Sequence, residues 1–348
     1  MDDSSTAVHV VTGKGGTGKS TVAGALALSL AAGGGRVLLL EVERRPSVAA
    51  TLGLSRLPDS PEKVATAEGG GEVFACSLDA EVVLEDYMST NVSSSLAVGA
   101  ARRFGVTEFA TAIAPGLRDV LLSGYVVAEA RRGDWKAVVV DAPPTGRIAR
   151  FLDVTRALGE LATTGPIHRQ ARDTAAFLRS DAVQVHMVTL AEPLPVRESI
   201  ESLDELREVG LPLGSVVVNK ILDDDLCAAA LSVDRDAVAG VVPALLGGAG
   251  GAGDGAGDGA DAGVGTGDGA DARAVTGALL TELDDVVARA GVQRDSMAVL
   301  RESWDGPVTR VPALAGGVRI EGLYDVAAIL DDLHDGEGLS GREDEVGR

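Results

Sequence analysis

A glycine-rich segment near the start of the chain limits the possible folds more than any other feature. Residues 13–21 read Gly-Lys-Gly-Gly-Thr-Gly-Lys-Ser-Thr, which fits the phosphate-binding pattern G-x-x-x-x-G-K-[ST]. Residues 7–12 before it are β-branched like a short buried strand, and residues 21–32 after it have the apolar spacing of a helix. Strand, glycine loop and helix in this order predict a nucleotide-binding α/β fold rather than a chance glycine turn.

The residues of this loop have separate expected roles in binding ATP and Mg²⁺. Glycines leave backbone N–H groups free to surround a triphosphate, and the start of the following helix adds partial positive charge. Lys19 is expected to reach the β- and γ-phosphates, and Ser20 to ligate Mg²⁺. The nucleotide-binding residues predicted in this segment are Gly13, Gly15, Gly16, Thr17, Gly18, Lys19, Ser20 and Thr21.

Strand-like and helical segments alternate along the rest of the chain. Further strands are expected at residues 37–42, 73–77, 137–141, 183–190, 215–218 and 308–311. Several are continuous Val/Leu runs, typical of strands covered on both faces, and the helices between them indicate parallel crossovers. The expected fold is therefore α/β: a doubly wound, mostly parallel sheet of P-loop NTPase type. An inserted helical subdomain is expected at about 79–133 and 147–180.

We expect one ATPase domain over residues 1–333. Residues 247–273 are almost wholly Gly, Ala and Asp, which predicts a disordered acidic linker. This linker would lengthen the connection between a strand that ends at Asn219 and a helix near Ala274. Residues 334–348 are expected to be a flexible tail.

Charge and composition limit the partners and the cellular location that are expected for the chain. With 52 acidic and 31 basic residues the net charge is −21, so nucleic-acid phosphates would be repelled and no nucleic acid is expected as a partner. Asp2 and Asp3 stand where a signal peptide would be basic, and no uninterrupted apolar run reaches the length of a membrane span. Cys76 and Cys227 are far apart. A cytoplasmic protein is expected.

Lys14 and residues 137–152 carry a resemblance to a known family. Lys14 follows the first glycine of the loop, and residues 137–152 read Ala-Val-Val-Val-Asp-Ala-Pro-Pro-Thr-Gly-Arg-Ile-Ala-Arg-Phe-Leu. The chain resembles the deviant P-loop ATPases of the arsenite-pump and tail-anchored-protein targeting type, as a divergent bacterial branch without their cysteine metal sites. The resemblance implies a dimer in which Lys14 crosses to the nucleotide of the other subunit, where a cation meets the developing γ-phosphate charge.

The resemblance also implies a second switch segment that begins at Asp141. An acid at the end of a Val-rich strand beside a phosphate-binding loop is expected to hold the Mg²⁺ shell, directly or through water. Thr145 and Gly146 are expected to sense the γ-phosphate and to move the helix that follows. Arg147 and the two residues after Asp141 depart from the family pattern Asp-Thr-Ala-Pro-Thr-Gly-His.

Glu43 stands where the resemblance implies the aspartate of the first switch, which orients or activates the attacking water. Glutamate keeps the carboxylate but adds a methylene, and a displacement of about one ångström can lower a rate on the order of a hundredfold. Two interpretations are open. Either Glu43 supports hydrolysis together with Lys14 and Lys19, or the chain is a weakly active regulatory subunit whose Lys14 serves a paralogous ATPase.

Two later residues are implied to enclose the adenine base. Asn219 follows a Val-rich strand, and its side-chain amide can both donate and accept hydrogen bonds. Pro312 lies in a Val-Pro-Ala-Leu segment that resembles the loop on the other side of the base. The resemblance as a whole implies an ATP- and Mg²⁺-dependent homodimer or heterodimer that couples hydrolysis to conformational change for a protein client or membrane partner.

Overall fold

The computed structural model describes residues 6–43, 46–84, 115–153, 166–247, 267–314 and 320–331. Its strands are β1 (Ala7–Gly13), β2 (Arg36–Glu41), β3 (Glu62–Thr66), β4 (Glu72–Ser77), β5 (Ala137–Asp141), β6 (Val183–Leu190), β7 (Leu213–Ile221) and β8 (Val308–Pro312). They form one sheet in the order β3-β4-β2-β5-β1-β6-β7-β8. Every neighbouring pair is parallel except β3 and β4. The predicted doubly wound, mostly parallel sheet is confirmed.

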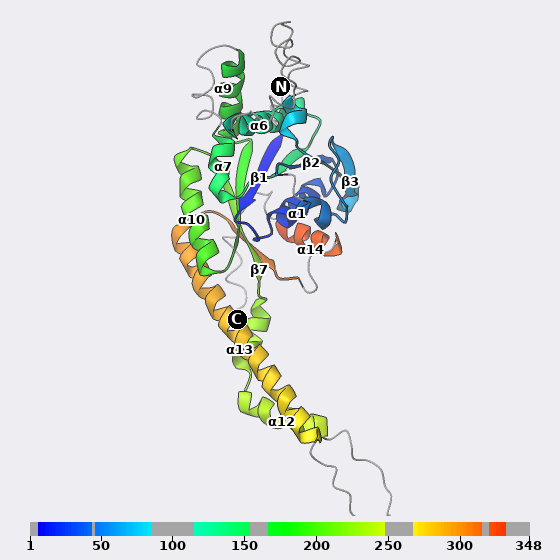
Figure 1. Ribbon diagram of the computed structural model, residues 1–348, viewed down its shortest axis with the longest axis vertical. Coiled ribbons are helices and arrows are strands. Elements are labelled where there is room, and N and C mark those ends of the chain that lie inside the picture. Colours follow the sequence, from blue (N-terminus) through cyan, green and yellow to red (C-terminus); the bar gives the residue numbers. More distant parts are fainter. Residues whose placement is uncertain are drawn as a thin grey trace, which may run out of the picture. The chain divides into compact units, whose positions relative to one another are not determined.

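Helices cover both faces of the sheet (Figure 1). On one face lie α1 (Lys19–Ala31), α2 (Ser47–Thr51) and α14 (Ile320–Leu330). Opposite them lie α7 (Thr145–Leu152) and α10 (Pro193–Glu208), with α6 (Pro115–Arg132) against α7, and α9 (Pro166–Leu178) against α6. A short 3₁₀ turn, η1 (Glu68–Gly70), joins β3 to β4.

Helix α1 forms the centre of the hydrophobic core on its face of the sheet. All its residues from Val22 to Ala31 are buried, and they pack with buried strand residues and with α14. A helix covered on all sides needs no polar stripe, which explains its Ala- and Leu-rich composition. This packing fixes the start of α1, and hence the end of the glycine loop, against the sheet.

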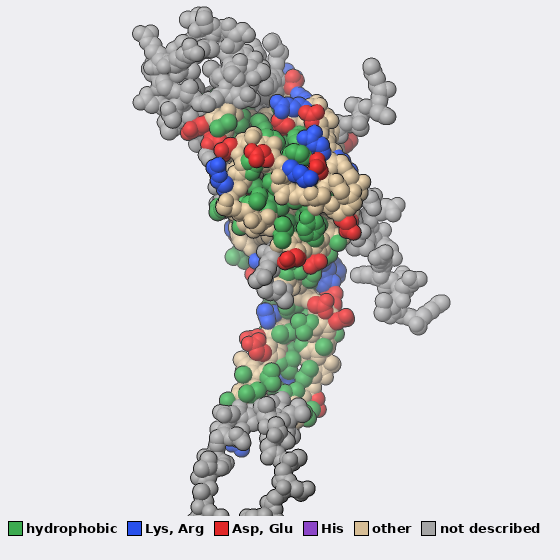
Figure 2. Space-filling view, turned by 90° about the vertical axis from the view of Figure 1, so that its right-hand side faces the viewer, with side chains coloured by type: hydrophobic (Ala, Val, Ile, Leu, Met, Phe, Trp, Pro, Cys, Tyr) green, Lys and Arg blue, Asp and Glu red, His purple; other side chains and the backbone are tan. Residues whose placement is uncertain are grey.

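The described chain has two compact units. One is Met1–Ile221 together with Val299–Arg348, and the other is Leu222–Ala298, which contains α11 (Asp224–Ser232), α12 (Arg235–Gly247) and most of α13 (Gly267–Ser303). Within the second unit the Gln293 amide bonds both backbone groups of Leu222, at 2.8 and 3.2 Å, and Arg235 pairs with Asp284. Large apolar side chains are exposed on this unit, and Figure 2 shows them among acidic ones.

The expected domain organisation, with its helical subdomain, linker and tail, stays a prediction. Helix α13 begins at Gly267, inside the segment predicted as a linker, whereas the sequence predicted a helix near Ala274. Helices α6 and α9 fall inside the predicted helical blocks, and α7 begins two residues before the second block. Residues 85–114, 154–165 and 248–266 and the predicted tail, 334–348, lie outside the described residues. The single domain over 1–333 stays a prediction. Within the described ranges, every helix is too short or too polar to cross a membrane.

Candidate functional site

The carboxyl ends of three adjacent strands define one edge of the sheet. Asp141 at the end of β5 is in register with Glu41 of β2 on one side and with Val11 of β1 on the other. The glycine loop starts at Gly13, two residues beyond Val11. In doubly wound α/β proteins, ligands bind outside the carboxyl ends of the strands. The strand order therefore brings the acids and the glycine loop to the edge where a ligand is expected.

The glycine loop takes a backbone shape that other residues would resist. Gly18 has φ 92°, and a Cβ on it would lie 2.2 Å from the amide nitrogen of Asn219. Gly13 has φ 155°, and a Cβ there would lie 2.1 Å from the carbonyl oxygen of Val188. Gly18 is also the N-cap residue of α1, so within the described chain the first N–H groups of this helix have no side-chain cap. Uncapped N–H groups at a helix start favour an anion.

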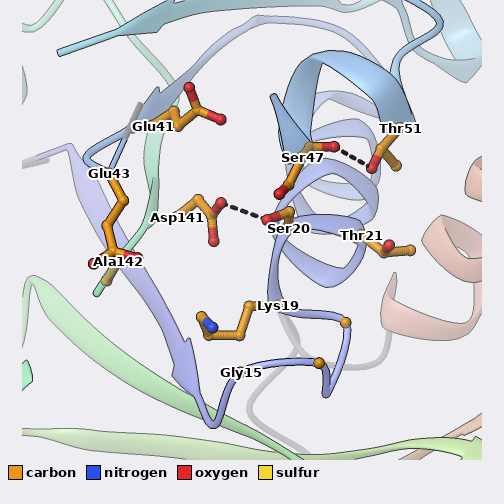
Figure 3. Close-up of a pocket in the computed structure, with 12 residues that line it drawn as sticks. Gly15, Lys19, Ser20, Thr21, Glu41, Glu43, Ser47, Thr51, Asp141 and Ala142 are labelled. Carbon is orange, nitrogen blue, oxygen red and sulfur yellow. Dashed lines mark hydrogen bonds between the residues drawn. The ribbon is translucent and has the colours of Figure 1, made fainter. Parts of the chain in front are cut away.

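A cavity of about 230 Å³ lies over this loop, between α1 and the strand ends (Figure 3). Because it faces the predicted phosphate-binding loop, it is called the phosphate cavity below. Its lining is Gly15, Gly16, Gly18, Lys19, Ser20, Thr21, Glu41, Glu43, Ser47, Thr51, Asp141 and Ala142. The Ser20 hydroxyl donates to Oδ2 of Asp141 at 2.7 Å. Hydroxyl and carboxylate oxygens are the ligands that Mg²⁺ uses beside nucleotide phosphates, so this pair fits the ion.

Asn219 braces the loop in this structure. Its amide nitrogen donates to the Thr17 carbonyl at 2.8 Å, and its Oδ1 accepts from the Lys220 N–H at 2.9 Å. Lys220, at a positive φ of 57°, extends its ammonium group to the Gly16 carbonyl at 3.3 Å. Asn219 and Pro312 do not belong to the lining of the phosphate cavity. Their contacts with a base stay predictions.

The second switch segment is tied to β1 by two hydrogen bonds. The Thr12 hydroxyl donates to the Pro143 carbonyl at 2.7 Å, and the Ala142 N–H donates to the Val11 carbonyl at 3.0 Å. Thr145 and Gly146 then open α7. Both lie outside the lining of the phosphate cavity, so sensing of the γ-phosphate by these residues stays a prediction.

Lys14 contacts its own subunit. Its ammonium nitrogen lies 2.5 Å from Oε1 of Glu198 in α10, and 51 % of its side chain is exposed. The backbone carbonyl of Lys14 accepts a long hydrogen bond, 3.4 Å, from the Lys19 ammonium group. The predicted cross-subunit lysine is thus held at the surface by an acid that the sequence did not connect with it.

Glu43 and Arg147 lie together beside a second cavity of about 230 Å³. Arg147 Nη1 lies 3.0 Å from Oε1 of Glu43, and Nη2 lies 3.7 Å from Oδ1 of Asp119 in α6. Burial raises the pKa of Asp119, and the neighbouring Arg147 is the main cause acting in the opposite direction. Glu43 lines this cavity as well as the phosphate cavity.

Sequence reasoning missed three polar residues that line the phosphate cavity, and Ala142 beside them. Glu41 is buried at the end of β2 and accepts from the Ser77 hydroxyl at 3.0 Å. Ser47 and Thr51 come from α2. Glu41 carried a usable signal, because an acid at the end of a run of buried Val and Leu residues calls for a polar neighbour. Ser47 and Thr51 carried none.

Comparison with known proteins decides the family. A model of the anion-transporting ATPases matches residues 6–180, which include the glycine loop, Glu43 and the second switch segment. The chain belongs to this family. The resemblance drawn from Lys14 and residues 137–152 is thereby confirmed.

Two relatives place this family member among ATPases. The chain is 49 % identical over 243 residues to the ATPase BagA of Mycobacterium tuberculosis, covering 66 % of this chain and 72 % of BagA. Over 255 residues it is 23 % identical to the ATPase GET3 of Rhodotorula glutinis, covering 64 % of this chain and 72 % of GET3. As a member of the anion-transporting ATPase family, the chain binds and hydrolyses ATP.

Proposed function

We propose that this family member is a cytosolic, Mg²⁺-dependent ATPase that works as a dimer, and that ATP binding and hydrolysis change its conformation for a protein client or membrane partner. One observation carries the proposal: the Ser20 hydroxyl and the Asp141 carboxylate lie 2.7 Å apart in the cavity that Lys19 also lines. A cation, a hydroxyl and a carboxylate around a glycine loop are the groups that Mg-ATP requires.

The glycine loop and four side chains of the cavity have roles in this proposal. The N–H groups of the loop and the Lys19 ammonium group bind the phosphates. Ser20 and Asp141 would hold Mg²⁺, which when bound neutralises phosphate charge. Glu43, at the edge of the same cavity, orients the attacking water. These roles involve both of the acids and the lysine that the sequence assigned to this site, and the loop serine.

Lys14 is proposed to act on the nucleotide of a second subunit. Its pairing with Glu198 does not oppose this role strongly, because exposed ion pairs contribute only about 0–1 kcal/mol. A bound triphosphate presents several negative charges and would compete well for the ammonium group. The exposure of the Lys14 side chain leaves it accessible to a partner subunit.

Conformational coupling is proposed to begin at the second switch segment. Pro143 is bonded to Thr12 of β1, and α7, which begins two residues later, packs against both α6 and α10. A shift of the segment on phosphate binding would therefore reach helices on that face of the sheet. This connection supports a change that extends beyond the nucleotide cavity.

The experiment combines ATP-binding calorimetry with and without Mg²⁺, phosphate release, and sedimentation with a non-hydrolysable ATP analogue. We expect Mg²⁺ to strengthen binding in the natural protein and not in Ser20→Ala or Asp141→Asn. Ser29→Ala serves as the matched control, because Ser29 lies on the same helix but bonds Asp331 at 2.6 Å. Binding that is indifferent to Mg²⁺ in the natural protein would contradict the metal role.

The same measurements distinguish an active dimer from the alternative, a weakly active regulatory subunit. An active dimer predicts phosphate release by the purified chain alone, together with association when the analogue binds. A regulatory subunit predicts binding with little phosphate release until a paralogous ATPase is added. Absence of association with the analogue and with a paralogue would contradict the dimer.

A further inference from the structure

One guanidinium group joins two carboxylates from different elements next to the phosphate cavity. Glu43 follows β2, Asp119 lies in α6, and Arg147 lies in the first turn of α7. The two terminal nitrogens of Arg147 are divided between them, 3.0 Å to Glu43 and 3.7 Å to Asp119. The fork of an arginine is planar and rigid, so two acids on its two arms restrict its orientation.

Glu43 lies on the boundary between two cavities. On one side it lines the phosphate cavity with Lys19 and Asp141, and on the other it lines the second cavity with Asp119 and Arg147. A glutamate has three rotatable side-chain bonds, and fixing them costs conformational entropy. A side chain that binds the Glu43 carboxylate therefore sets the position of that carboxylate at the phosphate cavity.

The three side chains of the cluster differ in how much of each is exposed to solvent. The Asp119 side chain is 6 % exposed and Glu43 is 15 % exposed, whereas Arg147 is 50 % exposed. Asp119 is therefore the buried end of the cluster, and Arg147 connects it to Glu43 at the edge of the phosphate cavity. Leu122 of α6 lines the second cavity and is itself buried, which gives the cluster a packed wall.

We propose that Arg147 is a positioning residue, which sets the Glu43 carboxylate at the edge of the phosphate cavity for the hydrolytic step and is itself oriented by Asp119. The inference rests on the catalytic role proposed for Glu43. It adds a link between the two switch segments, because Arg147 belongs to the second and Glu43 to the first. Movement of α7 then changes the position of the carboxylate that faces the nucleotide.

The test measures kcat and KM for ATP in full-length Arg147→Ala. We expect kcat to fall about 10- to 100-fold, as misplacement of a reacting group does, while KM stays within about twofold. Arg147→Lys, which keeps a cation, is expected to recover part of kcat. Arg150→Ala is the matched control, because Arg150 is exposed on the same helix, and it is expected to keep kcat within about twofold.

A second substitution separates the inference from the proposed function. Glu43→Gln tests the catalytic carboxylate, and adding Arg147→Ala to it is expected to lower kcat no further, because both changes remove the same interaction. Loss of activity in Glu43→Gln with natural kcat in Arg147→Ala would overturn the positioning role and leave the proposed function intact. Natural kcat in Glu43→Gln would instead overturn the catalytic role of Glu43. If Arg147→Ala does not fold, kcat of Arg147→Gln decides between the same outcomes.

Discussion

The glycine loop and the Glu43–Asp119–Arg147 cluster both border the phosphate cavity, the cluster through Glu43 alone, and they are built differently. The loop is nine consecutive residues, 13–21, whose shape comes from backbone angles that glycine accepts. The cluster joins three elements through charged side chains, and Glu43 and Arg147 are 104 positions apart. Local backbone geometry determines the first region, whereas packing between elements determines the second.

The difference suits two separate tasks. A loop fixed by glycine conformations and by the buried α1 helix keeps its shape when ligand binds, and so pre-organises the phosphate contacts. Arg147 is half exposed, so water can replace its contacts with the two acids when a triphosphate arrives. The comparison predicts larger losses of binding or turnover from substitutions in the loop than from substitutions of Arg147 or Asp119 in the cluster.

The largest effect is expected from Lys19→Ala, which removes the cation that the phosphate cavity places against the triphosphate. Turnover should fall at least on the order of a thousandfold, because electrostatic stabilisation inside such a site supplies much of the rate. Phosphate release at high ATP measures it. Lys136→Ala, whose lysine caps carbonyls at the opposite end of the sheet, is the control. Near-natural turnover in Lys19→Ala would contradict a role of the loop lysine in hydrolysis.

Lys14→Ala is expected to leave ATP affinity within about threefold while lowering turnover about 100- to 1,000-fold, as loss of a cation supplied in trans does. Calorimetry and phosphate release together separate the two effects. Glu198→Gln frees the Lys14 ammonium group from its partner, so turnover should rise by up to about fivefold. Natural turnover in Lys14→Ala would refute the cross-subunit role.

Gly18→Ala tests whether the backbone conformation of the glycine loop is needed for ATP binding. A Cβ at φ 92° is strained and meets the Asn219 amide, and strain of about 1–3 kcal/mol would weaken ATP binding on the order of tenfold or more. Full affinity in Gly18→Ala would mean that the loop tolerates other shapes.

The smallest effect is expected from Asp119→Asn. Because burial raises the pKa of Asp119, the folded chain holds this proton more tightly than the unfolded chain. The stability that this group contributes is complete below the ordinary pKa of an aspartate and is lost as pH rises through the raised one. The melting temperature of the variant should exceed that of the natural protein at neutral pH, and the gain should vanish in acid. A gain in melting temperature that instead grows in acid would contradict a raised pKa of Asp119.

The central strands could be predicted because buried parallel strands are continuous apolar runs. Residues 183–190 were predicted, and β6 spans Val183–Leu190. Strand β3 (Glu62–Thr66) was missed, because an edge strand that pairs antiparallel on one side needs no such run. Helices α11 and α12 were missed as well, and among their described side chains Leu226, Leu231 and Val241 are exposed rather than part of a buried stripe.

The sequence by itself determined the glycine loop, Lys19, Ser20 and the acid that ends β5, because each depends on neighbours along the chain or on a recurring strand end. It also marked Glu43 and Arg147, separately, as departures from the family pattern. Only the tertiary structure decided that these two side chains meet, 3.0 Å apart, and that Asn219 closes against Gly18. Contacts between side chains on different elements depend on how helices and strands pack, and spacing along one sequence does not contain that information.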